Sequence, residues 1–155
     1  MINRRKQGIA VMELLVVIAV LGLIFFIVIP QFSRTRELQV LKNGAGDILS
    51  SLDKARSQTL ASLNSSQYGV HFQSDKVIIF KGTVFSVGDP DNETINIIAP
   101  ANISDVTLSG ASGTSGDVYF NRLSGMPNQI GAITISTFSF SKIITISATG
   151  AASIN

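Results

Sequence analysis

The 155-residue chain has no cysteine and a single histidine, and both shortages restrict its chemistry. Without cysteine there is no disulfide framework and no thiolate metal site, so a folded domain must be stabilised by its packed core alone. His71 lies in a segment that predicts a strand, where a lone histidine is typical of a half-buried structural position. Because the chain has only one histidine and no nucleophile-elbow pattern, the sequence does not support a catalytic triad. Phosphate-cradling glycine motifs and zinc-ligand spacings are also absent, so we expect no enzyme.

A strong net charge is also lacking. The chain has 12 basic and 10 acidic side chains, and three of the basic ones fall within residues 1–8. The rest of the chain is therefore close to neutral, which argues against a strong nonspecific polyanion-binding surface. Four cations of that remainder are candidates for a nucleic-acid surface: Lys76, Lys81, Arg122 and Lys142. We interpret them as scattered solubilising charges, and nucleic acid is not an expected partner.

The longest apolar run extends from Ile9 to Ile29, and Glu13 is the only ionisable residue among its 21 members. A helix of that length measures about 30 Å, enough to cross the core of a bilayer. Basic residues 4–6 precede the run, and the positive-inside bias places the N-terminus in the cytoplasm. The sequence therefore predicts a single-pass membrane protein, with everything after Pro30 on the outer side of that membrane.

Glu13 needs a cation, because an ionised carboxylate within hydrocarbon costs about 3 kcal/mol on insertion scales. Beyond it along the chain, no lysine, arginine or histidine occurs before Arg34, about five helical turns away. A free α-amine at Ile9 would supply the charge, because positions four apart share one helix face. That amine exists only if the chain is cut after Gly8. One cut would thus remove the basic leader and create the countercharge.

These residues resemble the N-terminal signal of type IV pilins and pseudopilins: a short basic leader ending in Gly8, then Ile9, Glu13, the run ELLVVIAVLGLI and Pro30. Ile9 stands where the family usually has phenylalanine, and Ala10 where it usually has threonine. The resemblance implies that a prepilin peptidase cleaves between Gly8 and Ile9 and methylates the new amine. It also implies that Glu13 pairs with the Ile9 amine of a neighbouring subunit in a filament.

Two other interpretations of the apolar run remain open. A secretory signal peptide has a shorter apolar core followed by a small-residue cleavage site. Ala19 and Gly22 could suggest such a site, but the apolar run continues past them to Ile29. An uncut single-span anchor would explain the hydrophobicity but would leave Glu13 unpaired.

Four segments follow from these patterns: a cleaved leader (1–8), a membrane-spanning and filament-core helix (9–29), an amphipathic continuation (30–64) and a β-rich domain (65–155). Pro30 is expected to kink the helix at the membrane exit. The continuation is indicated by apolar or small residues spaced three and four apart: Leu38, Leu41, Ala45, Ile48, Leu52, Ala55, Thr59 and Leu63. Gly44 and Gly46 interrupt it, each at a cost of about 1 kcal/mol relative to alanine. They mark either a weak point of the helix or a close packing contact.

The rest of the chain predicts strands over residues 67–73, 76–81, 83–87, 94–99, 103–108, 117–121, 132–140 and 143–148. We expect a hairpin at Ser74-Asp75, turns or irregular chain at 88–93 and 123–129, a flexible loop at 109–116 and a joint at Lys142. Gly150 and the final residues would close the sheet edge. The predicted fold is α+β, with the long N-terminal helix packed on a C-terminal antiparallel β-sheet domain.

A second resemblance involves the segment ARSQTL (55–60), the strands after it and the closing ITISATG (144–150). Together they are similar to the GspH/FimT class of pseudopilins and minor pilins, in which the helix packs on two small sheets. The resemblance implies a minor pseudopilin of a type II secretion system, with other pilin subunits, the prepilin peptidase and the inner-membrane assembly platform as partners. A minor pilin of a type IV pilus, with a role in DNA uptake or adhesion, is the alternative. A major pseudopilin with a calcium-stabilised loop ranks behind the minor class, and a membrane-anchored enzyme stays open.

An oxygen-rich cluster formed by Asp89, Asp91, Asn92 and Glu93 is a weak candidate for calcium. It lacks the full spacing of a calcium loop. We favour an Asp-Pro turn in which Asn and Asp side chains bond to the local backbone. No metal or cofactor is therefore expected.

Overall fold

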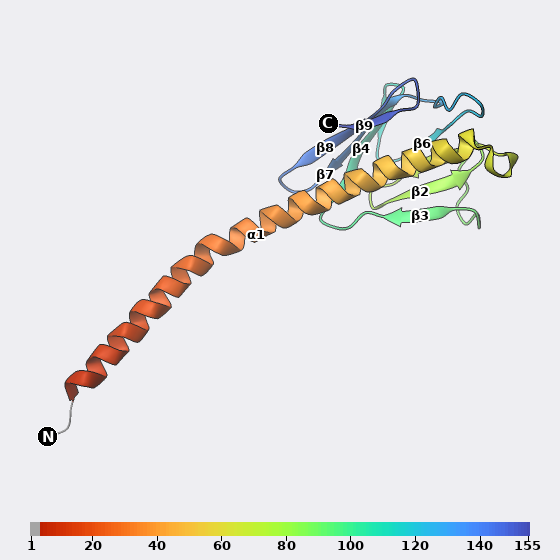
Figure 1. Cartoon of the computed structure of the whole chain (residues 1–155). Helices are drawn as coiled ribbons and strands as arrows, with labels where there is room; N and C mark the ends of the chain where they lie inside the picture. The colour runs from red at the N-terminus through yellow and green to blue at the C-terminus, as the bar shows by residue number, and fades with distance from the viewer. Residues whose placement is uncertain (1–3) are drawn as a thin grey trace. The chain divides into compact units, whose positions relative to one another are not determined.

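One long helix opens the chain, and strands in two sheets follow it (Figure 1). In this computed structural model the backbone is described for residues 4–155 and the side chains for residues 11–28 and 31–155. Helix α1 extends from Arg4 to Leu60. The chain divides into two compact units, Met1–Arg36 and Glu37–Asn155. The first three residues of the expected leader lie outside the described residues.

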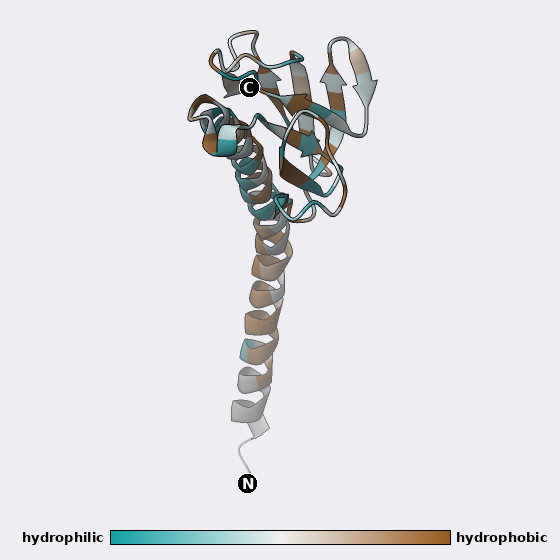
Figure 2. Ribbon diagram, turned by 90° about the vertical axis from the view of Figure 1, so that its right-hand side faces the viewer, coloured by the Kyte–Doolittle hydropathy of each residue, from teal (hydrophilic) through white to brown (hydrophobic). Residues whose placement is uncertain are grey.

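The first unit consists of the apolar part of α1. All side chains from Val11 to Val28 are exposed, and Figure 2 shows them as an almost uniformly hydrophobic stretch. The helix is long and apolar enough to cross a membrane, which is compatible with a single-pass membrane protein. The helical backbone continues through Pro30, and the kink expected there stays a prediction.

The second unit contains two antiparallel sheets. The first has the order β3-β2-β1-β6, with β1 at Tyr68–Phe72, β2 at Lys76–Lys81, β3 at Glu93–Asn96 and β6 at Gly116–Tyr119. The second has the order β5-β4-β7-β8-β9, with β4 at Asn102–Leu108, β5 at Ala111–Gly113, β7 at Gly131–Ser136, β8 at Ser141–Ile146 and β9 at Ala152–Ile154. A short 3-10 helix at Leu63–Ser65 joins α1 to β1. The predicted α+β class and the two sheets implied by the resemblance are confirmed.

The later part of α1 supplies one face of the core. Six members of the predicted stripe are buried, and the two end members are partly exposed; the buried ones are Leu41, Ala45, Ile48, Leu52, Ala55 and Thr59. All of them except Thr59 belong to one cluster with apolar side chains of both sheets, among them Val70, Phe72, Ile103 and Ile133. Thr59 also fixes the helix to β1, because its Oγ1 accepts a hydrogen bond of 2.9 Å from the backbone N–H of Tyr68.

The two glycines of the stripe have different surroundings, and the helix does not unwind at either. A Cβ on Gly44 would lie 2.7 Å from Cδ1 of Ile135 and 3.5 Å from Cγ2 of Ile97, whereas a Cβ on Gly46 would meet nothing within 4 Å. The interpretation as a close packing contact is therefore confirmed for Gly44, and Gly46 is simply tolerated. Local unwinding at this point was the wrong alternative.

Alanine substitutions at these glycines are expected to differ in their effect on stability. Gly46→Ala should raise the free energy of unfolding by up to about 1 kcal/mol, because alanine is the better helix former. In Gly44→Ala the new methyl group should clash with the Cδ1 methyl group of Ile135, and this cost should cancel the gain. The free energy of unfolding of Gly44→Ala should therefore be equal to or lower than that of the wild type. Urea unfolding of a fragment starting at Glu37, which holds the whole buried cluster, measures both. Equal stabilisation by the two substitutions would contradict the packing contact.

Two strand-region predictions are wrong. Residues 83–87 form no strand, because β3 occupies the place beside β2, and Val84 and Val87 are 78% and 86% exposed. Residues 109–116 are not a flexible loop, since β5 pairs with β4 across the turn at Ser109-Gly110. Small side chains give no apolar periodicity, so the sequence pattern missed a strand held by backbone hydrogen bonds.

The joint of the last strand pair is also displaced from its predicted position. Lys142 lies within β8, opposite Ile135 of β7. The turn occupies residues 137–140, where the N–H of Thr137 donates to the carbonyl of Phe140 and the N–H of Phe140 donates to Oγ1 of Thr137. Of the predicted strand 94–99, only the part up to Asn96 is a strand. Glu93, which was predicted to belong to the turn at 88–93, is instead the first residue of β3. The Ser74-Asp75 hairpin, the irregular 123–129 segment and the closing edge strand β9 are confirmed.

Candidate functional site

Glu13 is a single carboxylate on an apolar helix. Its neighbours Met12, Val16 and Val17 form a shallow hollow with it, and its side chain is exposed. Among the side chains that the structure describes, none pairs with it as a cation. Gly8 and Ile9 are helical in backbone, and the side chain of Ile9 lies outside the described set. Ile9 precedes Glu13 by four positions on one helix, which is the spacing of neighbours on a helix face.

The electrostatics of this site follow from its surroundings. In hydrocarbon an ionised carboxylate needs an opposite charge, and the exposed position of Glu13 makes it available to one on another chain. A new α-amine at Ile9, four positions before Glu13, would supply that opposite charge either to Glu13 of the same chain or to Glu13 of a second chain. An ion pair between this carboxylate and an amine on a second helix would form at only one relative height of the two helices.

The acidic turn before β3 is bound by local contacts and by lysines. Oδ1 of Asp89 accepts the backbone N–H of Asp91 at 2.9 Å, which is the expected turn geometry. Asp91 forms an ion pair of 2.9 Å with Lys81 of β2, and its carboxylate raises the pKa of Lys81 through this hydrogen bond. Asn92 donates to the carbonyl of Ser86.

The third acid of the candidate calcium cluster has a distant partner. Glu93 forms an ion pair of 2.6 Å with Lys54 of α1, 39 residues away. Within the described residues, no three acidic, histidine or cysteine side chains form a group that could hold a metal ion. Asp89, Asp91 and Glu93 are divided between a turn and two ion pairs, and the side-chain bonds to the local backbone expected of the turn are present.

His71 is largely buried, with 13% of its side chain exposed. Its Nδ1 pairs with Asp117, its cross-strand neighbour on β6, and its Nε2 lies 3.0 Å from the side-chain amide nitrogen of Gln73. The ring stacks on Phe85 with centroids 3.9 Å apart. The predicted half-buried structural position is confirmed, whereas the sequence pattern missed Phe85 and Asp117 as its partners.

The four candidate nucleic-acid cations are divided among two strands and a loop. Lys76 and Lys81 occupy the two ends of β2, Lys142 belongs to β8 in the other sheet, and Arg122 follows β6. Lys81 is paired with Asp91, and Arg122 donates to the backbone carbonyl of Ser65 at 2.9 Å. Their distribution over two sheets and a loop leaves Glu13 as the site with the clearest chemistry.

Compared with protein-family models, curated proteins and solved structures, the chain shows no match.

Proposed function

We propose that this chain is a structural subunit of a type IV pilus-like filament, as a minor pseudopilin of a type II secretion system. The observation that supports it is a single carboxylate, Glu13, on an exposed apolar helix that can cross a membrane. A lone acid at this position is explained by a partner amine at Ile9, created by cleavage after Gly8. The family resemblance of the same residues supports the same role.

The proposed mechanism is assembly rather than catalytic turnover. The first part of α1 waits in the inner membrane, and the prepilin peptidase frees and methylates the amine of Ile9. Glu13 then pairs with the amine of an adjacent subunit as the helix leaves the membrane for the filament core. In low dielectric, removing either partner leaves a charge that costs about 3–5 kcal/mol. The β-rich unit remains on the outside of the filament.

The packing of the second unit supports a subunit that survives extraction. The buried stripe of α1 belongs to the same apolar cluster as both sheets, so the helix and the sheets form one body. Thr59 and the Lys54–Glu93 ion pair add polar links between helix and strands. A pull on the helix is therefore transmitted to the whole unit.

Cleavage is tested by the mass of the mature protein. In a host with an active prepilin peptidase, we expect the membrane-extracted chain to begin at Ile9 and to carry one methyl group on its amine. Intact-mass and N-terminal peptide spectrometry measure both. Material that still begins at Met1 in that host would refute the proposal, and a peptidase-deficient host is the control.

The choice of machine is tested by deletion of the gene. If the chain serves type II secretion, its loss should strongly reduce export of folded substrates through the outer membrane and leave DNA uptake and adhesion unchanged. Complementation by the wild-type gene is the control. Normal export together with lost uptake or adhesion would instead identify a minor pilin of a type IV pilus.

A further inference from the structure

The turn between β7 and β8 presents a phenylalanine to solvent. Phe138 is 90% exposed, whereas Phe140 on the other side of the turn is partly buried and packs against the core cluster. The turn is closed twice, because the N–H of Thr137 donates to the carbonyl of Phe140 at 2.8 Å and the N–H of Phe140 donates to Oγ1 of Thr137 at 3.2 Å. The Phe138 ring therefore projects from the tip of a closed turn and has no place in the core.

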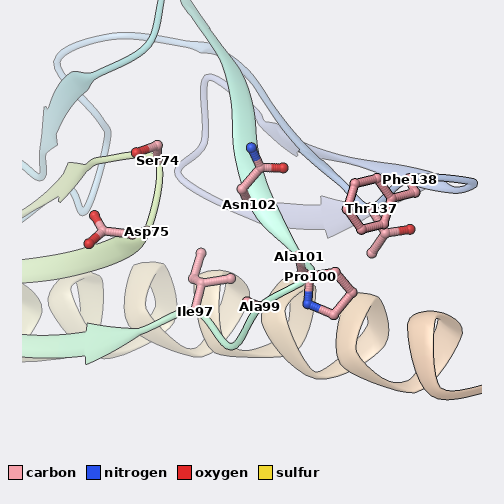
Figure 3. A pocket seen from close by; sticks show the side chains of 9 residues that line it. All are labelled: Ser74, Asp75, Ile97, Ala99, Pro100, Ala101, Asn102, Thr137 and Phe138. Atoms are coloured by element: carbon pink, nitrogen blue, oxygen red, sulfur yellow. The ribbon is translucent and has the colours of Figure 1, made fainter.

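Phe138 lies at one side of a hollow of about 530 Å³ between the β7–β8 turn and the β3–β4 loop (Figure 3). Ala99 and Pro100 of that loop line the hollow together with Phe138. Ile98, the residue before them, is 66% exposed. Figure 3 shows Asp75, the one charged residue of the lining, at the far side of the hollow from Phe138. We call Ile98, Ala99, Pro100 and Phe138 the phenylalanine patch.

This patch lies at the end of the second unit where α1 joins it. Ile97, which lines the same hollow, and Ile135, near the end of β7, both lie next to Gly44. The second unit begins only a few residues before Gly44. At the other end Leu60 lies against Gly125, and the helix from Gly44 to Leu60 measures about 24 Å. The patch is therefore on the side of the unit that follows directly after the apolar part of the chain.

The chain between the apolar run and the second unit is short. From Ile29, the last residue of the run, to Glu37, where the second unit begins, the helix measures about 12 Å, and this length holds at any angle between the two units. The headgroup region is itself about 5–8 Å deep on each side of a bilayer. Side chains 31–36 are all exposed and include Arg34 and Arg36, cations that anionic headgroups attract. Because spanning helices commonly tilt, a projection at this end of the unit can reach the headgroups.

We propose that the phenylalanine patch binds the surface of the bilayer that α1 spans, with the Phe138 ring inserted among the lipids. A separate protein partner would need roughly 1,000 Å² of buried interface, whereas the patch consists of one turn and one loop. A tethered contact needs less, because the spanning helix makes the second contact intramolecular and raises its effective concentration. Apolar side chains accompanied by cations are also the composition that favours a membrane interface. The inference requires a membrane-spanning α1 and goes beyond the filament role, on which it does not rest.

The chain has no tryptophan, so one introduced tryptophan reports on a single position. The full-length Phe138→Trp chain is reconstituted in vesicles of phosphatidylcholine and phosphatidylglycerol. Its fluorescence should be largely lost when the lipids are brominated near the headgroup end of their acyl chains. Leu123→Trp is the matched control, because Leu123 is 91% exposed in the loop that lies against Leu60 through Gly125. It should keep its fluorescence, and equal quenching of the two variants would overturn the proposal.

A third tryptophan separates this inference from the proposed function. Val20→Trp, within the apolar run, should be quenched by lipids brominated deep in their acyl chains. Quenching of Val20→Trp without quenching of Phe138→Trp would overturn the patch and leave the proposed function standing. No quenching of either would refute the spanning helix on which the proposed function also depends. Emission of Phe138→Trp at a shorter wavelength without quenching by lipid would indicate a protein contact, such as a second copy, and would also overturn the proposal.

The role of the phenyl ring is tested with a reporter on the neighbouring loop. Brominated lipids should quench Ile98→Trp, and adding Phe138→Ser should lower the ratio of lipid-bound to free second units about tenfold, since the insertion of a phenyl ring is lost. Ser139→Ala, an exposed position of the same turn, is the control and should leave the quenching of Ile98→Trp unchanged. Because these side chains are exposed, the melting temperature of the second unit should stay at the wild-type value, which shows that the variants fold. Undiminished quenching in the Phe138→Ser background would overturn the insertion of Phe138.

Discussion

Glu13→Leu is expected to be inserted and cleaved like the wild type but to enter filaments at least about a hundredfold less. Insertion becomes easier, because an ionised carboxylate no longer enters hydrocarbon. Assembly fails because the Ile9 amine of the neighbouring subunit would be left without its countercharge. Removing one partner of a buried ion pair costs about 3–5 kcal/mol, and about 1.4 kcal/mol corresponds to a tenfold change in an equilibrium constant.

The measurement compares the chain in sheared filaments with the chain in membranes. Glu13→Asp keeps the charge on a shorter side chain and should recover part of the incorporation. Leu21→Ala, about two helical turns further on the same apolar segment and outside the hollow around Glu13, is the matched control and should behave as the wild type. Wild-type incorporation of Glu13→Leu would refute the role of the ion pair, whatever the outcome of cleavage.

The helix and most strands could be predicted because their burial repeats along the sequence. The spacing of Leu41, Ile48, Leu52 and Ala55 alone identified the face of α1 that is buried. Alternation of apolar residues with serine and threonine likewise identified β7 and β8. The same signal misled at 83–87, where only Phe85 is turned toward the sheet and the valines are exposed.

The features that were missed depend on contacts distant in sequence. Glu93 looked like part of a local acidic cluster, but its partner Lys54 lies on the helix. Asp117 became the partner of His71 only when β1 and β6 paired. The positive φ of Leu123 has no signal in residue type, since sequence rules reserve that conformation for glycine and asparagine. Glu13, in contrast, was visible at once because it breaks an otherwise apolar run.

Gly69 has no side chain because an aromatic ring occupies that space. It lies in β1 opposite Phe80 of β2, and Phe80 is almost completely buried. A Cβ on Gly69 would lie 2.5 Å from Cζ of Phe80 and 2.8 Å from the backbone carbonyl oxygen of Val118. The Phe80 ring in turn meets Phe85 edge to face, with centroids 5.8 Å apart. Gly69 thus makes room for the ring of Phe80, and Phe80 in turn packs against Phe85 in the segment after β2.

Gly69→Ala is therefore expected to lower the free energy of unfolding by about 2–3 kcal/mol, as overpacking of a filled core does. Alanine would otherwise be favoured over glycine in a strand, so the sign of the effect tests the contact itself. Urea unfolding of the fragment that starts at Glu37 measures the loss. Gly113→Ala in the exposed strand β5, where the nearest atom lies at 3.4 Å, is the matched control and should change stability by less than about 0.5 kcal/mol.

A second substitution identifies which neighbour carries the cost. If the Phe80 ring is responsible, Phe80→Leu should be less harmful in the Gly69→Ala background than in the wild type, because the smaller side chain makes room for the methyl group. If the Val118 carbonyl is responsible, the two losses should add, because no side-chain change moves the β6 backbone. Wild-type stability of Gly69→Ala would contradict both, and would mean that the ring and the strand shift together at little cost.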